Sequence, residues 1–159
     1  MIKRIVCAVA ILLFTQSFLF GVEPLFSKPN EKVRNFKVAD LTGNYVSLSD
    51  FNNGRVLLFF WTTWCPYCRD ELKQLNAQAS QLEKDGLAVL PINVGESKSK
   101  VENFLKSRNL TLRVFLDEDS SVSQGFDLLG VPTYILIDTQ GIIRSKEHSF
   151  PQKKIKELR

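Results

Sequence analysis

Apolar and polar positions alternate in blocks along the chain, and the period of each block predicts its secondary structure. The runs at 55–61 (RVLLFFW) and 87–94 (LAVLPINV) are short and almost continuously apolar, as in strands buried on both faces of a sheet. Because a proline donates no hydrogen bond to a ladder, we expect Pro91 at the end of its strand or at a bulge. Apolar residues at steps of three and four over 66–85 predict a helix, which Gly86 can end.

The remaining segments complete an alternation of strands and helices. Two short alternating stretches flank Thr42-Gly43-Asn44, which predicts a β-hairpin near the N-terminus. Further along, the pattern predicts a helix at 97–109, a strand at 112–117, a short helix at 122–129, a hairpin at 133–148 that turns near 138–141, and the beginning of a helix in the tail PQKKIKELR. Strands that alternate with helices and close with a hairpin predict an α/β fold, with a mixed central sheet and helices on both faces.

The first residues, MIKRIVCAVAILLFTQSFLFGVEP, have another pattern. Lys3 and Arg4 precede an apolar stretch, which is the layout of an export signal. The residues at 19–21 do not form a small-x-small cleavage site, and the stretch is long enough to stay as a membrane anchor. The predicted organisation is a signal peptide or anchor at 1–22, a linker at 23–35 and one domain at 36–159.

Composition and charge fit this organisation and exclude some functions. A chain of 159 residues with 44% hydrophobic and 24% charged residues is typical of one globular domain. The net charge of +4 falls to +2 when Lys3 and Arg4 are left out. That excess is too mild to indicate nucleic-acid binding, so we expect no nucleic-acid partner.

The chemistry of the chain centres on its cysteines. Cys7 lies inside the predicted signal and reads as an apolar filler, so the exported domain holds only Cys65 and Cys68, in FFWTTWCPYCRDEL. Cys65 follows a predicted strand and precedes a helix, whose unpaired first amides and dipole favour a thiolate there. Pro66 fits the first helical position. Cys68 lies one turn along the same face and can close a disulfide, so the pair can exchange with a partner disulfide.

Two inert interpretations compete with this one. A zinc site needs four ligands, but no further cysteine remains in the domain, and the single histidine, His148, is distant in the sequence. We therefore expect neither a metal nor a cofactor. A static disulfide in a non-catalytic module, such as a metal chaperone, stays open as an alternative.

The motifs around the cysteines resemble those of a known family. FFWTTWCPYC after a buried strand, followed later by GVPTYILIDTQG, resembles the thioredoxin superfamily. The preceding FKVADLTGNYVSLSDF and the long segment between the two motifs are similar to the exported TlpA/ResA-like branch of thiol–disulfide oxidoreductases. The resemblance covers about residues 33–148. It implies a thioredoxin-like three-layer fold, in which the N-terminal hairpin is an extension.

The resemblance also implies roles for residues around the pair. Val131–Pro132 would be a cis peptide that faces the cysteines and receives the backbone of the partner. Trp64 would flank Cys65 on the docking surface, with core packing as the alternative. Trp61 is assigned to the core.

Glu71 has two interpretations. An acid in the first turns of a helix is favoured by the helix dipole alone. Thioredoxin itself carries an acid on the preceding strand, where this chain has Phe59, but the ResA-like branch has a glutamate at the position of Glu71. The resemblance therefore implies that Glu71 shuttles the proton of Cys68.

The function that the resemblance implies is exchange of thiols and disulfides outside the cytoplasm, in the periplasm or on the outer face of the cytoplasmic membrane. It suggests reduction, commonly of apocytochrome c, with a membrane electron donor or acceptor of the thiol type. A peroxidase is a second possibility, because Thr62 stands three residues before Cys65 as in peroxiredoxins. Leu58, however, occupies the place where the peroxiredoxin pattern has a proline.

Overall fold

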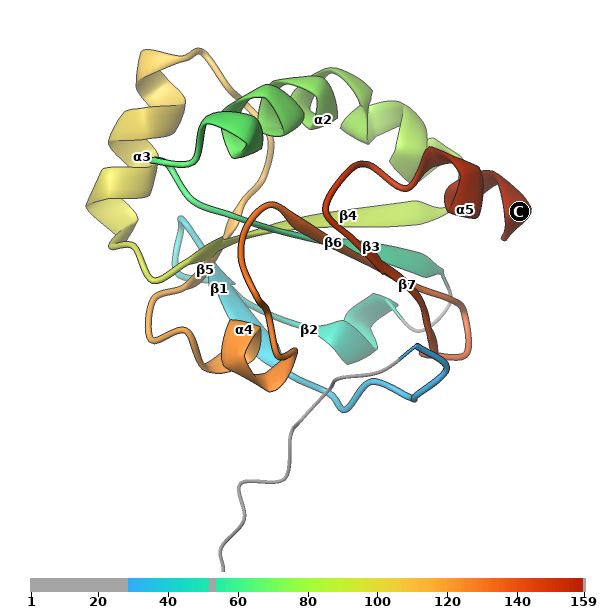
Figure 1. Ribbon diagram of the computed structural model, residues 1–159. Helices are drawn as coiled ribbons and strands as arrows, with labels where there is room; N and C mark the ends of the chain where they lie inside the picture. The colour runs from blue at the N-terminus through green and yellow to red at the C-terminus, as the bar shows by residue number, and fades with distance from the viewer. Residues whose placement is uncertain (1–28, 52–53, 159) are drawn as a thin grey trace, which may run out of the picture.

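The computed structural model describes residues 29–51 and 54–158, so the predicted signal or anchor and Cys7 lie outside the described residues. The described strands form a seven-stranded sheet in the order β2-β1-β5-β4-β3-β6-β7 (Figure 1). Their bounds are β1 Lys37–Asp40, β2 Tyr45–Ser47, β3 Arg55–Trp61, β4 Leu87–Val94, β5 Phe115–Asp117, β6 Thr133–Ile137 and β7 Ile143–Glu147.

The sheet is mixed, as the sequence predicts. β3 runs parallel to β4, and β4 runs parallel to β5. The pairs β1–β2, β1–β5, β3–β6 and β6–β7 are antiparallel. Because parallel strands end at the same edge, the residues that follow β3 and β4 come together there.

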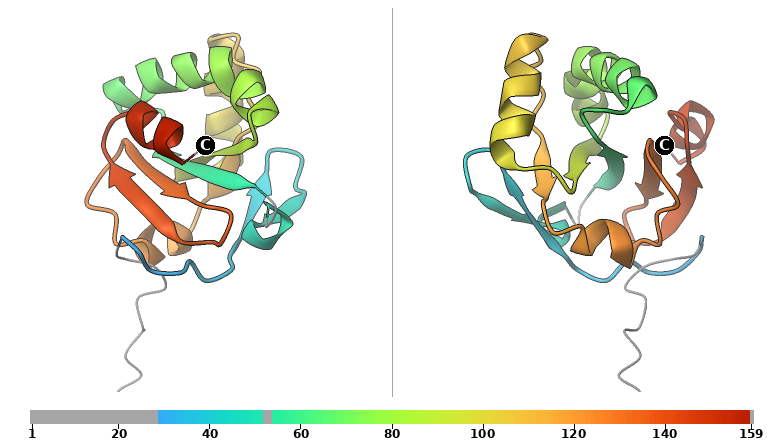
Figure 2. Two further views of the ribbon diagram at one scale, coloured as in Figure 1. Left: turned by 90° about the vertical axis from the view of Figure 1, so that its right-hand side faces the viewer. Right: turned by 60° about the vertical axis from the view of Figure 1, so that its left-hand side comes forward.

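Helices cover both faces of the sheet, which confirms the three layers. Figures 1 and 2 show α2, α3 and α5 over one face, and α4 with the 3₁₀ turn η1 over the other. The bounds are η1 Leu48–Phe51, α2 Pro66–Lys84, α3 Lys98–Ser107, α4 Ser121–Gly125 and α5 Gln152–Glu157. Within the described ranges, no helix is long and apolar enough to span a bilayer.

Strand β3 supplies side chains to two cores, one on each face of the sheet. All seven of its residues are buried, and successive side chains point to opposite faces. Val56, Leu58 and Phe60 pack towards η1 and α4. The alternate residues, with Trp61 fully buried among them, pack towards α2, α3 and α5 in the core that also holds both cysteines of the motif.

Pro91 is a correction to the sequence analysis, because it lies inside β4 and not at an end or a bulge. It pairs in regular register with Phe59 of β3. On its other side, β5 pairs with β4 only from Ile92 onward. A proline nitrogen that faces that unpaired side removes no ladder hydrogen bond.

Two predicted elements are shorter than expected. The strand predicted over 112–117 begins only at Phe115, because the backbone N–H groups of Thr111 and Leu112 donate to the Asn76 side chain on α2 instead of to a neighbouring strand. The helix predicted over 122–129 ends at Gly125, and Asp127 then adopts a left-handed backbone with φ 46°.

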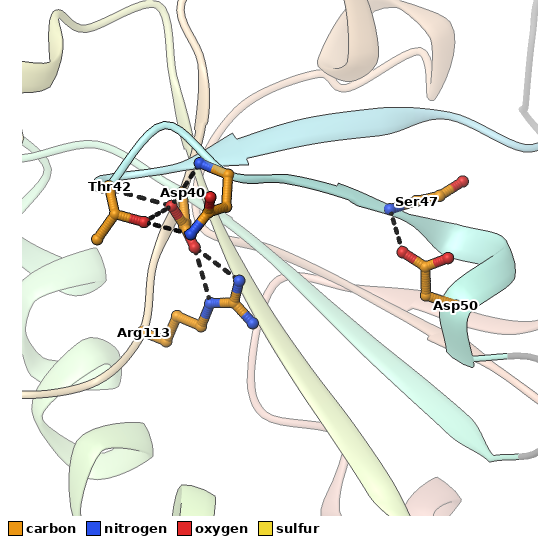
Figure 3. A network of polar contacts seen from close by, with 6 residues as sticks. Asp40, Thr42, Ser47, Asp50 and Arg113 are labelled. Atoms are coloured by element: carbon orange, nitrogen blue, oxygen red, sulfur yellow. Dashed lines mark hydrogen bonds and ion pairs between the residues drawn. The ribbon is translucent and has the colours of Figure 1, made fainter.

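The N-terminal hairpin is confirmed, and one carboxylate holds it to the rest of the sheet. Asp40 accepts hydrogen bonds from Thr42 Oγ1 at 2.6 Å, from the backbone of Thr42 and Asn44, and from Arg113 Nη2 at 2.6 Å (Figure 3). Gly43 takes the left-handed turn position, with φ 88°. The bonds from Thr42 and Arg113 outweigh the effect of burial and lower the pKa of Asp40.

Part of the predicted linker packs against the domain. The backbone N–H of Asn30 donates to the carbonyl of Ile143 at 2.8 Å, and that of Val33 to Gly141 at 2.9 Å. Val33 is buried in the core under η1. Packed structure therefore begins ahead of residue 36.

Candidate active site

Cys65 caps the N-terminus of α2. Its backbone is extended, with φ −76° and ψ 116°, and its Sγ accepts a hydrogen bond from the backbone N–H of Cys68 at 3.3 Å. Pro66 occupies the first turn, where no N–H is needed. One of the four unpaired amides of the helix is thus directed at the sulfur, which favours negative charge on it.

Cys68 lies beneath Cys65 and is completely buried, at 0% exposure against 4% for Cys65. Both are free thiols. Burial, and then the hydrogen bond and the charge of the Cys65 sulfur, raise the pKa of the Cys68 thiol, and a backbone contact with Thr62 opposes them only in part. The two sulfurs therefore have different environments, although two residues separate them.

The Val131–Pro132 peptide is cis and borders the cysteines, as the resemblance implies. Cys65 Sγ donates to the Val131 carbonyl oxygen at 3.6 Å. His148 supports this loop from behind, with Nδ1 2.9 Å from the Pro132 carbonyl oxygen. A carbonyl oxygen only accepts, so His148 donates from Nδ1.

The surface beside Cys65 is apolar and exposed. Trp64 is 62% exposed, so its alternative placement in the core is wrong. Tyr67 and Leu129 are also large exposed hydrophobic residues. Trp64, Leu129 and Val131 border a groove of about 410 Å³. Polar side chains, among them Glu96 and Lys100, also line the groove.

Glu71 is half-buried on α2, and it contacts β6. Its Oε2 accepts a hydrogen bond from the hydroxyl of Tyr134 at 2.8 Å. Cys68 precedes it by three residues on the same helix, which is about one turn. The carboxylate therefore points towards the sheet, where it contacts Tyr134, and its place on the helix is about one turn from Cys68.

Glu96 is a site residue that the sequence analysis missed. It is buried and accepts hydrogen bonds from the backbone N–H and the Oγ1 of Thr63, at 2.6 and 2.7 Å. Asn93 Nδ2 donates to it at 2.8 Å, and Lys100 Nζ pairs with it at 2.7 Å. Arg69 Nε completes the clamp by donating to the Thr63 carbonyl at 2.8 Å. These bonds fix the loop that leads from β3 into α2.

The sequence analysis missed two residues of the site, Glu96 and Tyr134. The sequence contains a signal for Glu96 but none for Tyr134. Glu96 follows β4 as Thr63 follows β3, and the carboxyl ends of parallel strands share an edge. Tyr134 gave no such signal, because its link to Glu71 depends on how β6 faces α2. Among the described residues, no cluster of histidine, cysteine and acidic side chains could hold a metal ion.

Comparison with solved structures assigns the fold. The structure is similar to the thioredoxin domain of a thiol-disulfide oxidoreductase from Bacteroides vulgatus, with a TM-score of 0.71 and 22% identity over 83% of this chain and 99% of that one. It is also similar to StoA from Bacillus subtilis, with a TM-score of 0.67 and 24% identity over 79% and 96% of the two chains. The molecule therefore has the thioredoxin fold.

Residues 29–146 match the AhpC/TSA family, and the chain belongs to that family. Among curated relatives, it is 37% identical over 107 residues to the thiol-disulfide oxidoreductase ResA of Bacillus subtilis (strain 168). The aligned stretch covers 67% of this chain and 60% of the length of that relative.

Proposed function

We propose that the chain is an extracytoplasmic thiol–disulfide oxidoreductase that reduces disulfides of partner proteins. The observation that carries the proposal is the position of Cys65, which caps α2 under the Cys68 amide and lies beside the cis Val131–Pro132 peptide. The similarity to relatives named thiol-disulfide oxidoreductases supports the same class.

The proposed reaction has two steps that balance. The thiolate of Cys65 attacks one sulfur of the partner disulfide, that S–S bond breaks, and the released partner thiolate takes up a proton. Cys68 then loses its proton and attacks Cys65, so that the mixed disulfide breaks and the second partner sulfur leaves and is protonated. The partner gains two electrons and two protons, and the chain ends with a Cys65–Cys68 disulfide.

Further residues take roles in these steps. Glu71 accepts the proton of Cys68, whose raised pKa makes a base necessary near neutral pH. Trp64, Pro66 and the Val131–Pro132 backbone form the docking surface, where the partner chain lies in the groove next to Cys65.

Residues 1–22 serve in this proposal as the export signal or anchor. The disulfide is returned to the dithiol form by a membrane electron donor of the thiol type, and apocytochrome c before haem attachment is the proposed partner.

Labelling of intact cells with a membrane-impermeant maleimide tests the location. Cys65 should be labelled in cells that express the full chain and should be protected when residues 1–22 are deleted. Protection of the full chain in cells first treated with a membrane-impermeant reductant, which opens any Cys65–Cys68 disulfide outside, would place the site in the cytoplasm.

A redox titration with alkylation and mass analysis tests the reaction. The pair should cycle reversibly, and the purified protein should reduce insulin disulfides. Cys65→Ser should abolish reduction, whereas Cys68→Ser should accumulate a mixed disulfide with the partner. A pair that resists mild reductant would indicate a static disulfide. Rapid turnover of hydrogen peroxide without insulin reduction would indicate a peroxidase.

A further inference from the structure

Tyr134 is a buried polar side chain in the same core as the two cysteines. It is fully buried, at 0% exposure, on β6. Its ring stacks on Phe59, with centroids 4.6 Å apart and an interplanar angle of 20°. Phe150 contacts it edge-on at 5.8 Å and 88°. The two aromatic contacts restrict the orientation of the phenol ring.

That hydroxyl is directed at Glu71. It donates to Oε2 at 2.8 Å, and within the described residues this is the one hydrogen bond that the Glu71 carboxylate receives. Burial, and then the hydrogen bond and charge of Glu71 and the charge of Cys68, raise the pKa of the Tyr134 phenol. The phenol therefore stays protonated and acts as a donor, not as a proton carrier.

The described charged groups on neighbouring elements form no ion pair with the carboxylate. On α2, the titratable residues one turn earlier are Tyr67 and Cys68. α5 packs on this side of the sheet, where Lys153 and Lys154 pair with Glu157 and Lys156 is exposed. Among described residues no cation forms an ion pair with Glu71, so Tyr134 is the contact that can fix the orientation of its carboxylate.

We propose that Tyr134 is a positioning residue for Glu71. The phenol holds Oε2, so that the other oxygen of the carboxylate faces Cys68 and takes its proton when the mixed disulfide is resolved. The proton moves from Cys68 to Glu71, and Tyr134 keeps its own. This inference rests on the proposed function, because it assumes that Glu71 is the base for Cys68.

The experiment separates the two thiol steps in time. Reduced full-length protein is mixed with dithiobis(nitrobenzoate), an aromatic disulfide whose thiolate product absorbs visible light. Attack by Cys65 releases a first thiolate, and attack by Cys68 on the resulting mixed disulfide releases a second. Stopped-flow absorbance then gives one rate for each cysteine.

Tyr134→Phe removes the hydroxyl and keeps the ring stack. We expect the second release to slow about tenfold, the effect of losing one hydrogen bond to a charged group, while the first release is unchanged. Glu71→Gln should slow the second release about a hundredfold, because it removes the base. Tyr45→Phe is the matched control, since Tyr45 is 74% exposed on the edge strand β2, and it should change neither rate.

Double substitution distinguishes positioning from a general structural role. In the Glu71→Gln background, Tyr134→Phe should have no further effect on the second release. Across pH, the slowing by Tyr134→Phe should shrink as pH rises and Cys68 ionises without a base. Glu71→Asp, which shortens the side chain and separates it from the phenol, should behave like Tyr134→Phe and provides a second test if that variant folds poorly.

The outcomes separate the two proposals. If Glu71→Gln slows the second release and Tyr134→Phe does not, the inference is wrong and the proposed base stands. If Tyr134→Phe slows the second release equally in the wild-type and Glu71→Gln backgrounds, the inference is also wrong, because Tyr134 would then act without Glu71. If Glu71→Gln has no effect, both the base and the positioning role fail, although thiol–disulfide exchange itself can remain.

Discussion

The two cysteines of the site differ in accessibility and in their hydrogen bonds. Cys65 keeps 4% exposure and its sulfur receives the Cys68 N–H, whereas Cys68 is completely buried. Burial and the neighbouring sulfur of Cys65 raise the pKa of the Cys68 thiol. Because the thiolate is the reactive form, this difference supports the proposed roles, in which Cys65 attacks the partner and Cys68 resolves the mixed disulfide.

Alkylation should follow the same order. From about pH 6 to about pH 9, a range that includes the free thiol value of about 8.5, iodoacetamide should modify the Cys68→Ala protein at least about tenfold faster than the Cys65→Ala protein. The first variant retains Cys65, and the second retains Cys68. Mass spectrometry over a time course measures both rates. Equal rates would mean that burial does not distinguish the two thiols in solution.

Glu96 should matter for stability as well as for the site. Glu96→Gln replaces an acceptor of four polar groups by an amide that must turn an N–H towards a donor, so the free energy of unfolding should fall by about 2–3 kcal/mol. Glu102→Gln on α3, the helix that follows the loop of Glu96, is the control, since its pair with Lys98 is partly exposed and should contribute less than about 1 kcal/mol. Urea unfolding measures both, and similar losses would contradict the clamp.

At the scale of elements, the N-terminal hairpin depends on Asp40. Its pKa is lowered, so the folded state binds fewer protons than the unfolded state between the folded value and about 4. The stability that Asp40 contributes is therefore complete at neutral pH and is lost as pH falls below about 4. Asp40→Asn should cost about 2 kcal/mol at pH 7, and the difference from wild type should shrink in acid.

Asp50→Asn is the matched control for this substitution. Asp50 is exposed and accepts one backbone hydrogen bond, from Ser47 at the other end of the hairpin (Figure 3). Asp50→Asn should therefore lower the free energy of unfolding less than Asp40→Asn does. Urea unfolding at about pH 7 and about pH 2 decides, because the contribution of Asp40 is lost only below about pH 4, and a loss for Asp40→Asn that is the same at both pH values would contradict the ionic role.

The elements also show what the sequence could predict. β3, α2 and the hairpin of β6 and β7 were predicted well, because a buried apolar run, a helical period and turn residues are local signals. β5 was predicted too long, because the bonds from Asn76 that divert the preceding segment join positions far apart in the sequence. The cysteines lie in a local motif, whereas the Tyr134–Glu71 contact depends on the packing of a strand against a helix.

For the whole molecule, the two cores have different consequences for chemistry. The core under α2, α3 and α5 contains both cysteines, while the core under α4 and η1 contains neither. Leu72 lies one turn beyond Cys68 on α2 and is fully buried with it. Leu90 on β4 is equally buried in the opposite core, at 1% exposure. Substitution of Leu72 or of Leu90 should therefore remove a similar amount of packing, in the first case beside Cys68 and in the second in the opposite core.

Leu72→Ala and Leu90→Ala should each cost about 3–5 kcal/mol, since both leave a cavity in a packed core. Only Leu72→Ala opens space beside Cys68, so it alone should relieve part of the burial that raises the pKa of that thiol. Cys68 should then be alkylated faster in the Leu72→Ala protein, tested in a Cys65→Ala background, while Leu90→Ala leaves the rate unchanged. Urea unfolding confirms that the two losses of stability are comparable. Equal acceleration in both variants would mean that global loosening, and not local burial next to α2, controls the reactivity of Cys68.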